Sequence, residues 1–285
     1  MSKTKLITDS DSSLSLEIAA RYDIDIVPIT IQFGDESFAT NTNIDIDDKL
    51  LFEKIDATGK LPTTAAPSPG AFVEAYTKAF AAGADSIICI CVSSKVSRTY
   101  ESATLAAKEF PGKKINVVDS LYMSLGQGIV VLAVAEALQK GVSDEEAIKI
   151  GTDMIPHLAT FASFNTLKYL VMGGRVSKFS AGMAGALDIR PLLTMKDGSL
   201  QVLEKVRTRK AAMERLVNLI VESAKGKKIE RIGIFHICNE ADAIVLQQLL
   251  RERLDLPEEI LFMQFTPGLS VHAGAGMIGT AFYAV

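Results

Sequence analysis

Hydroxyl-bearing side chains gather in the segment CVSSKVSRTYESA, between a predicted strand and a predicted helix. Val92 ends the pattern of a buried strand, and the helical pattern begins near Thr99. Ser93, Ser94 and Ser97 lie in the turn between them. A helix N-terminus presents free N–H groups and the positive end of the helix dipole, so hydroxyl donors there suit a carboxylate or a phosphate. Simple capping of the helix by a hydroxyl side chain is the alternative interpretation.

Other segments carry further side chains that could hold an anion. Thr64 precedes a helix start in KLPTTAAPSPGAF, where the alternative is an ordinary loop of turn-forming residues. Arg207 lies between a strand pattern and a helix pattern in EKVRTRKAA, and it is either a carboxylate clamp or a solvated charge. Arg175 follows two glycines in MGGRVSK and is expected in an exposed turn.

The C-terminal segment SVHAGAGMIGTAFYAV contains His272, one of three histidines in the chain. Its Gly274, Gly276 and Gly279 spell G-x-G-x-x-G, but six residues follow Gly279. That is too short for the helix and second strand of a dinucleotide-binding fingerprint. The glycines are therefore expected to permit a close backbone approach or a positive φ, and to leave His272 accessible.

Composition excludes several classes of function. The 285 residues are 48% hydrophobic and 22% charged, with a net charge of −4 and no tryptophan, which indicates a globular protein without nucleic acid as a partner. Cys89 and Cys91 are spaced C-x-C without nearby histidines, so we expect buried thiols and no metal site. Polar residues interrupt the apolar stretch at 121–138, so no stable membrane span is expected. With no secretion signal at its start, the chain is expected in the cytoplasm.

Strand and helix patterns alternate through the first half, which is typical of an α/β fold with a parallel sheet. One such strand pattern, IDIVPITIQF, covers residues 24–33. In the second half, Asp197-Gly198 separates two alternating runs and predicts a hairpin, hence a mixed sheet. We therefore expect two α/β lobes, an N-terminal lobe at 1–160 with the hydroxyl-rich loops and a C-terminal lobe at 161–285.

The segments also follow the order of motifs in the DegV family of bacterial fatty-acid-binding proteins. ITDSDSSLS resembles the opening T-D-S of that family, and TTAAPSPGAF is similar to its T-S-Q-P-S-P-G loop. SSKVSRTYESA resembles S-S-x-L-S-G-T-Y-x-S-A, and TLKYLVMGGRVSK resembles T-L-x-Y-L-x-x-G-G-R-I-S. VHAGAGMIG is similar to the family's H-x-G-x-G-x-x-G. The resemblance covers essentially the whole chain, and the order of so many motifs makes it specific.

The resemblance implies one long-chain fatty acid buried between the lobes, with its acyl chain in an apolar tunnel. Carried over residue by residue, it assigns the carboxylate to Thr64, Ser97, Arg207 and His272, with Ser93 and Ser94 lining the same pocket. It implies a non-catalytic lipid-binding protein, without a cofactor other than the fatty acid. A separate ATP-using fatty acid kinase is the implied partner and forms an acyl phosphate, with Arg175 a candidate docking residue.

The chain departs from the family pattern in two places. Ala65 and Ala66 replace a Ser-Gln pair beside Thr64, and Arg98 replaces the glycine after Ser97. If that glycine needs a positive φ, Arg98 distorts the loop; otherwise its guanidinium can reach the head group or the cleft. Two other functions stay open, an acyl hydrolase or transferase with Ser97 as nucleophile and His272 as base, and a regulatory docking protein.

Overall fold

A computed structural model describes residues 3–40, 46–174 and 189–285. The helices are α1 (Leu16–Arg21), α2 (Asp48–Thr58), α3 (Pro69–Ala81), α4 (Thr99–Ala107), α5 (Leu125–Gln139), α6 (Asp144–Met154), α7 (Lys168–Met172), α8 (Arg209–Ala224), α9 (Glu240–Arg253) and α10 (Pro267–Ala273). The strands are β1 (Thr4–Asp9), β2 (Ile24–Val27), β3 (Thr30–Phe33), β4 (Glu36–Ala39), β5 (Thr63–Ala65), β6 (Ser86–Cys91), β7 (Lys114–Asp119), β8 (Leu158–Ser163), β9 (Arg190–Lys196), β10 (Ser199–Val206), β11 (Ile229–His236), β12 (Leu261–Gln264) and β13 (Ile278–Ala284).

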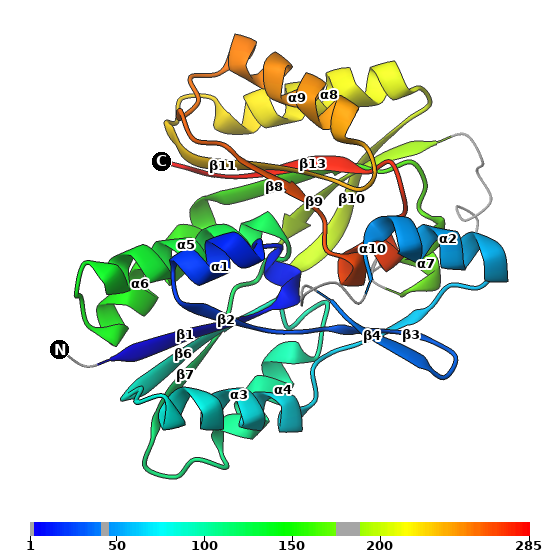
Figure 1. Ribbon diagram of the computed structural model, residues 1–285. Coiled ribbons are helices and arrows are strands. Elements are labelled where there is room, and N and C mark those ends of the chain that lie inside the picture. The colour runs from blue at the N-terminus through cyan, green and yellow to red at the C-terminus, as the bar shows by residue number, and fades with distance from the viewer. Residues whose placement is uncertain (1–2, 41–45, 175–188) are drawn as a thin grey trace.

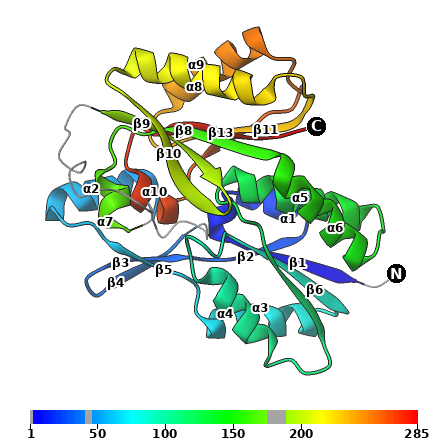
Figure 2. The ribbon, with the colours of Figure 1, turned by 180° about the vertical axis from the view of Figure 1, so that it is seen from behind.

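The elements stack in five layers (Figure 1). Helices α3 and α4 cover the outer face of a parallel sheet, and α8 and α9 cover the outer face of a larger mixed sheet. A middle layer lies between the two sheets, with α1, α5 and α6 toward one side and α2, α7 and α10 toward the other. The view from behind shows the same order (Figure 2). The expected α/β fold with one parallel and one mixed sheet is confirmed.

The first sheet has the strand order β2-β1-β6-β7 with every pair parallel. Every residue of β6, SIICIC, is buried, because helices cover both faces of the sheet. The carboxyl ends of these strands meet at one edge, the position where open parallel sheets bind ligands. The serine-rich loop after β6 therefore lies where a ligand site is expected.

One strand prediction is wrong. Residues 24–33 do not form one strand, because Pro28 separates β2 from β3 and the two enter different sheets. Proline has no N–H to donate to a sheet ladder. The N–H of Ile29 turns inward instead and donates to Ser10 Oγ at 2.9 Å. Strand β3 pairs with β4 and β5 in a small antiparallel sheet that the sequence analysis missed.

The second sheet has the order β10-β9-β8-β13-β11-β12, in which β11 and β12 are parallel and the other pairs antiparallel. The hairpin at Asp197-Gly198 is present, with φ angles of 51° and 78° at the two turn residues. Two positive φ values are the signature of the turn type that Asp-Gly favours. The expected lobe boundary near residue 160 falls inside β8, and this division remains a prediction.

The apolar stretch at 121–138 forms mainly helix α5, which is buried between the two sheets. The largest hydrophobic cluster joins Ile88 of the first sheet to Phe235 and Ala281 of the second through α5. A helix that is apolar on all sides is expected in such a layer. Among the described residues, no helix is both long and apolar enough to cross a membrane.

Candidate functional site

A cavity of about 530 Å³ lies between the lobes at the carboxyl edge of the parallel sheet. The loops after β1 and β6 line it from one lobe, and the end of β8, the start of β10, α7 and α10 line it from the other. Its apolar lining consists of Ile29, Ala66, Val96, Met123, Phe164, Leu170, Leu200, Phe265, Leu269 and Ala273. Cavities of this size enclose small organic ligands.

Hydroxyl and imidazole groups meet at this cavity. Thr64 Oγ1 and His272 Nε2 are 2.8 Å apart in a hydrogen bond, although 208 positions separate them in sequence. Ser94 and Ser97 line the same cavity. These side chains are half-buried, so a ligand can reach them without unfolding the loops. The structure thus brings together four of the six residues assigned to the fatty acid site.

Small residues set the position of His272. A β-carbon on Gly173, at the end of α7, would lie 2.4 Å from His272 Nδ1, so α7 can pack against α10 only without a side chain there. A β-carbon on Gly276 would lie 1.9 Å from Asn165 Nδ2, and the φ of Gly276 is 85°. Gly274 also has a positive φ, of 80°, and a β-carbon on Gly279 would lie 2.4 Å from the Phe235 ring, so the expectation that the three C-terminal glycines permit close approach or positive φ is confirmed.

His272 itself lies in α10, a helix that the sequence analysis did not predict. Thr266 is the residue before the helix and Pro267 its first residue, an arrangement typical of helix starts. This signal was present in QFTPGLSVHAG. The helix presents His272 toward Thr64, which lies in strand β5 and not in the loop that the sequence suggested.

Two residues assigned to the ligand lie elsewhere. Ser93 is fully buried and donates from Oγ to the Gly198 carbonyl at 2.7 Å, so it joins the lobes at the hairpin turn. Arg207 is exposed just beyond β10, about 20 Å along the strand from Leu200 in the cavity wall. Neither is among the described residues that line the cavity. Arg175 lies outside the described residues.

Arg98 occupies the family's glycine position without strain. Its φ is −86°, so this site does not require a glycine, and the distortion considered from the sequence does not occur. The side chain is 86% exposed, lines the cavity, and lies 3.4 Å from Glu101 Oε2 through Nε. Lys95 lines the same opening. Two cations therefore stand beside Ser97 at the edge of the cavity.

Asp9 of the opening T-D-S motif holds the loop after β6 in place through hydrogen bonds, a role that its sequence did not indicate. The buried Asp9 carboxylate accepts N–H bonds from Val92 at 2.7 Å and Asp11 at 3.0 Å. The side-chain amide of Gln127 donates to it at 3.2 Å. Burial raises the pKa of Asp9 to about 6, and these donors oppose that rise. Asp9 thereby ties the loop after β6 to β1 and α5.

A second buried carboxyl, Asp48, makes stability depend on pH. It is fully buried in the first turn of α2 and accepts a hydrogen bond from Gln264 Nε2 at 3.0 Å. Burial raises its pKa from 3.8 to about 6. Between about pH 4 and 6 the folded protein keeps a proton that the unfolded chain releases. This contribution to the free energy of unfolding is therefore complete below pH 4 and is lost as the pH rises through 6.

Asp48→Asn is expected to remove that dependence. Relative to the parent protein, the variant should gain about 2 kcal/mol of unfolding free energy between pH 4 and pH 8. Urea unfolding across this range measures it. Asp56→Asn, at an exposed position later in the same helix, is the matched control and should follow the parent curve. Parallel curves for Asp48→Asn and the parent protein would contradict the assignment.

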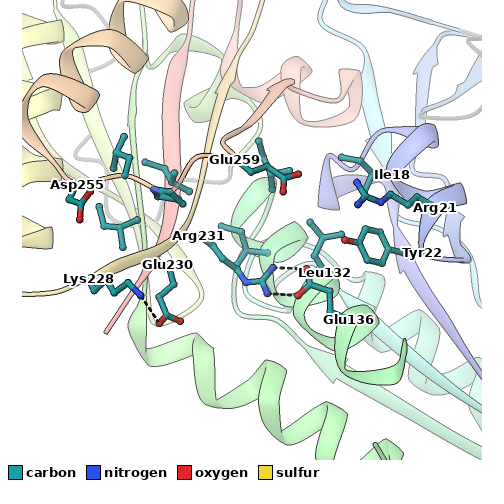
Figure 3. A pocket seen from close by; sticks show the side chains of 16 residues that line it. Ile18, Arg21, Tyr22, Leu132, Glu136, Lys228, Glu230, Arg231, Asp255 and Glu259 are labelled. Carbon is teal, nitrogen blue, oxygen red and sulfur yellow. Dashed lines mark hydrogen bonds and ion pairs between the residues drawn. The ribbon is translucent and has the colours of Figure 1, made fainter. Parts of the chain in front are cut away.

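A larger crevice of about 720 Å³ lies on another side of the lobe interface, between α1 and α5 and the strands β11 and β12. Figure 3 shows the Arg231 guanidinium hydrogen-bonded to the Glu136 carboxylate, at 2.9 and 2.5 Å. Further charges line it, from Arg21, Lys228, Glu230, Asp255 and Glu259. An acyl chain here would desolvate these charges at high cost. The hydroxyl-lined cavity is therefore the better site for an apolar ligand.

The pair in this crevice joins α5 to the second sheet. Arg231→Ala is expected to lower the free energy of unfolding by about 1–2 kcal/mol, because Glu136 loses its partner while staying half-buried. The double variant Arg231→Ala with Glu136→Ala should recover part of this loss. Lys228→Ala, which breaks an exposed pair with Glu230 at 4.0 Å, is the control and should change less than about 0.5 kcal/mol. If Arg231→Ala and Lys228→Ala lower the free energy of unfolding equally, the Arg231–Glu136 pair does not have this joining role.

The polar side chains of the site are hydrogen-bonded to neighbouring hydroxyl groups. Ser97 Oγ is hydrogen-bonded to Thr99 Oγ1 at 2.8 Å, and His272 Nε2 to Thr64. Among the described residues no hydrogen bond joins Ser97 to His272, as a nucleophile and its base require. In the same part of the chain, no three His, Cys, Asp or Glu side chains are grouped so that they could hold a metal ion.

Comparison with known proteins gives one consistent result. A family model described as an uncharacterised protein of the DegV family matches residues 3–285. A DegV domain-containing protein of Caldanaerobacter subterraneus is 32% identical over 285 residues, covering 99% of each chain. A fatty-acid-binding DegV family protein from Thermus thermophilus is 30% identical, with a TM-score of 0.91 over 99% of this chain and 100% of that one. DegV from Bacillus subtilis, described as a fatty acid binding protein, is 28% identical, with a TM-score of 0.86 over 99% and 100%. This chain is a member of the DegV family.

Proposed function

We propose that this protein binds one long-chain fatty acid in the cavity between the lobes and presents it, in the cytoplasm, to a separate ATP-dependent kinase. The carboxylate lies among Thr64, Ser97 and His272, with Ser94 beside them, and the acyl chain follows the apolar wall. The observation that carries this proposal is the convergence of hydroxyl and imidazole groups on an otherwise apolar cavity. The similarity of this chain to DegV proteins described as fatty-acid-binding supports the same proposal.

The acyl chain supplies most of the binding free energy. Fifteen buried carbons at about 0.8 kcal/mol each give a gross gain of about 12 kcal/mol. The loss of translational and chain freedom on association reduces this considerably. The head group therefore needs only hydrogen-bond partners and a fixed orientation. Neutral donors satisfy the carboxylate while leaving an oxygen available for reaction.

In the kinase step, the reacting groups belong to the bound fatty acid and the nucleotide rather than to this chain. A carboxylate oxygen attacks the γ-phosphorus of a nucleoside triphosphate, and the bond from that phosphorus to the bridging oxygen breaks. A nucleoside diphosphate leaves and an acyl phosphate forms. The sequence has no G-x-x-x-x-G-K-[ST] motif to cradle a nucleotide, which favours a separate kinase. Binding and presentation are thus the non-catalytic part played by this protein.

Denaturing mass spectrometry of the purified protein tests the proposal. We expect a co-purifying long-chain fatty acid, or its uptake when palmitate or oleate is added. If no fatty acid co-purifies and none is taken up, the proposal is overturned. Hydrolysis of short or long acyl esters, lost in Ser97→Ala, would instead favour the alternative enzyme.

Docking of the kinase is the second part of the proposal. Arg175 is the residue that the sequence offers for it, after the glycine pair at the end of α7. Arg175→Glu should weaken capture of the kinase in a pull-down while palmitate binding stays unchanged. Undiminished capture would argue against this contact.

A further inference from the structure

We propose that Arg98, together with Lys95, gives the cavity a preference for single-chain lipids whose head group is a phosphate. This inference rests on the proposed function, because it needs an acyl chain bound in the cavity. It concerns a different part of the site from the groups that meet the carboxylate. The two cations stand on the turn before α4, on either side of Ser97 in sequence.

The charge of the head group decides which partners it needs. A carboxylate carries one negative charge, which hydroxyl and imidazole donors such as Thr64, Ser97 and His272 can satisfy. A phosphate monoester carries close to two charges above pH 7 and has three acceptor oxygens. It also extends further from the acyl chain than a carboxylate does. A phosphate in this cavity would therefore need cations at the edge, beyond the neutral donors.

Arg98 is free to supply such a cation. Its side chain is 86% exposed, and its ion pair with Glu101 is a single contact of 3.4 Å, which costs little to exchange. Guanidinium is the side-chain group best suited to bind phosphate oxygens in pairs. Glu101, also in the lining, offsets part of this charge. Removing Glu101 should therefore strengthen phosphate binding, the opposite effect to removing Arg98.

Competition against a fluorescent fatty acid, with palmitate and hexadecyl phosphate as ligands, tests this preference at pH 8. Arg98→Gly should weaken hexadecyl phosphate about tenfold and leave palmitate within about twofold. Arg98→Lys should recover part of the loss, and Glu101→Gln should tighten hexadecyl phosphate. Lys108→Gln, about 14 Å away at the other end of α4, is the control and should change neither ligand. At pH 5, where the phosphate carries one charge, the effect of Arg98→Gly should shrink.

The outcomes separate this inference from the function on which it rests. If the parent protein binds palmitate but Arg98→Gly leaves hexadecyl phosphate unchanged, the inference is overturned and the fatty acid site stands. Equal weakening of both ligands in Arg98→Gly would also overturn it, since that indicates a structural role for Arg98. Inorganic phosphate without an acyl chain should not displace the fluorescent ligand; displacement would show that phosphate binds there without an acyl chain, and would overturn the inference. If the parent protein binds neither palmitate nor hexadecyl phosphate, the proposed function is overturned as well.

Discussion

Replacing Ser97 and His272 together by alanine is expected to lower the affinity for palmitate about 100-fold. Each substitution removes a hydrogen bond to a charged carboxylate, and such bonds contribute about 1.5 kcal/mol or more. The acyl chain still buries its apolar surface, so some binding remains. Displacement of a fluorescent fatty acid by palmitate measures the change.

Methyl palmitate is the matched ligand for this experiment. Its ester lacks the negative charge, so its weaker affinity should fall less than about threefold in the double variant. Thermal unfolding should show that the variant is folded, because both residues are half-buried rather than part of the core. Unchanged palmitate affinity would place the head group elsewhere in the cavity. Equal losses for acid and ester would point to a collapse of the cavity.

Gly173→Val should reproduce the loss of His272 without touching that residue. The first carbon of the new side chain would lie 2.4 Å from His272 Nδ1 and 3.2 Å from the Tyr169 carbonyl, so the imidazole must move away from Thr64. We expect the affinity for palmitate to fall at least about 30-fold, since the helix contact is disturbed as well. The same displacement experiment measures it.

A double-mutant cycle gives this prediction its control. In a His272→Ala background, Gly173→Val should cost much less than it does alone, because the displaced imidazole is already absent. Gly70→Ala, where the nearest atom to the added carbon is 3.6 Å away, should leave binding unchanged. Fully additive losses would show that Gly173 acts on the fold and not through His272.

Local patterns were sufficient for most of the fold. The buried run SIICICV, the Asp197-Gly198 turn and the helical spacing after Ser68 each predict one element, because each depends on neighbouring residues. The break at Pro28 is also a local signal, yet the alternation on both sides of it suggested one strand. Strand β13 inserts between β8 and β11, and such an order depends on long-range packing that no single segment reveals.

The candidate site was only partly accessible from sequence, for a similar reason. Hydroxyl-rich loops at the ends of parallel strands indicate an anion site, and the family motifs selected Thr64, Ser97 and His272. Nothing in the spacing distinguishes Ser97, in the cavity wall, from Ser93, which is fully buried against the hairpin turn. Arg207 follows the right motif but lies beyond the end of a long edge strand. Which residues face a cavity depends on the packing of one lobe against the other.

The proposed function requires that a fatty acid carboxylate lie between Thr64, Ser97 and His272. Carbon-13 NMR of palmitate labelled at its carboxyl carbon observes this position without relying on affinity. We expect one bound resonance, distinct from free palmitate, that shifts in Ser97→Ala and in His272→Ala but not in Lys108→Gln. A carboxyl resonance that is the same in all four proteins, or no bound resonance in the parent protein, would contradict it.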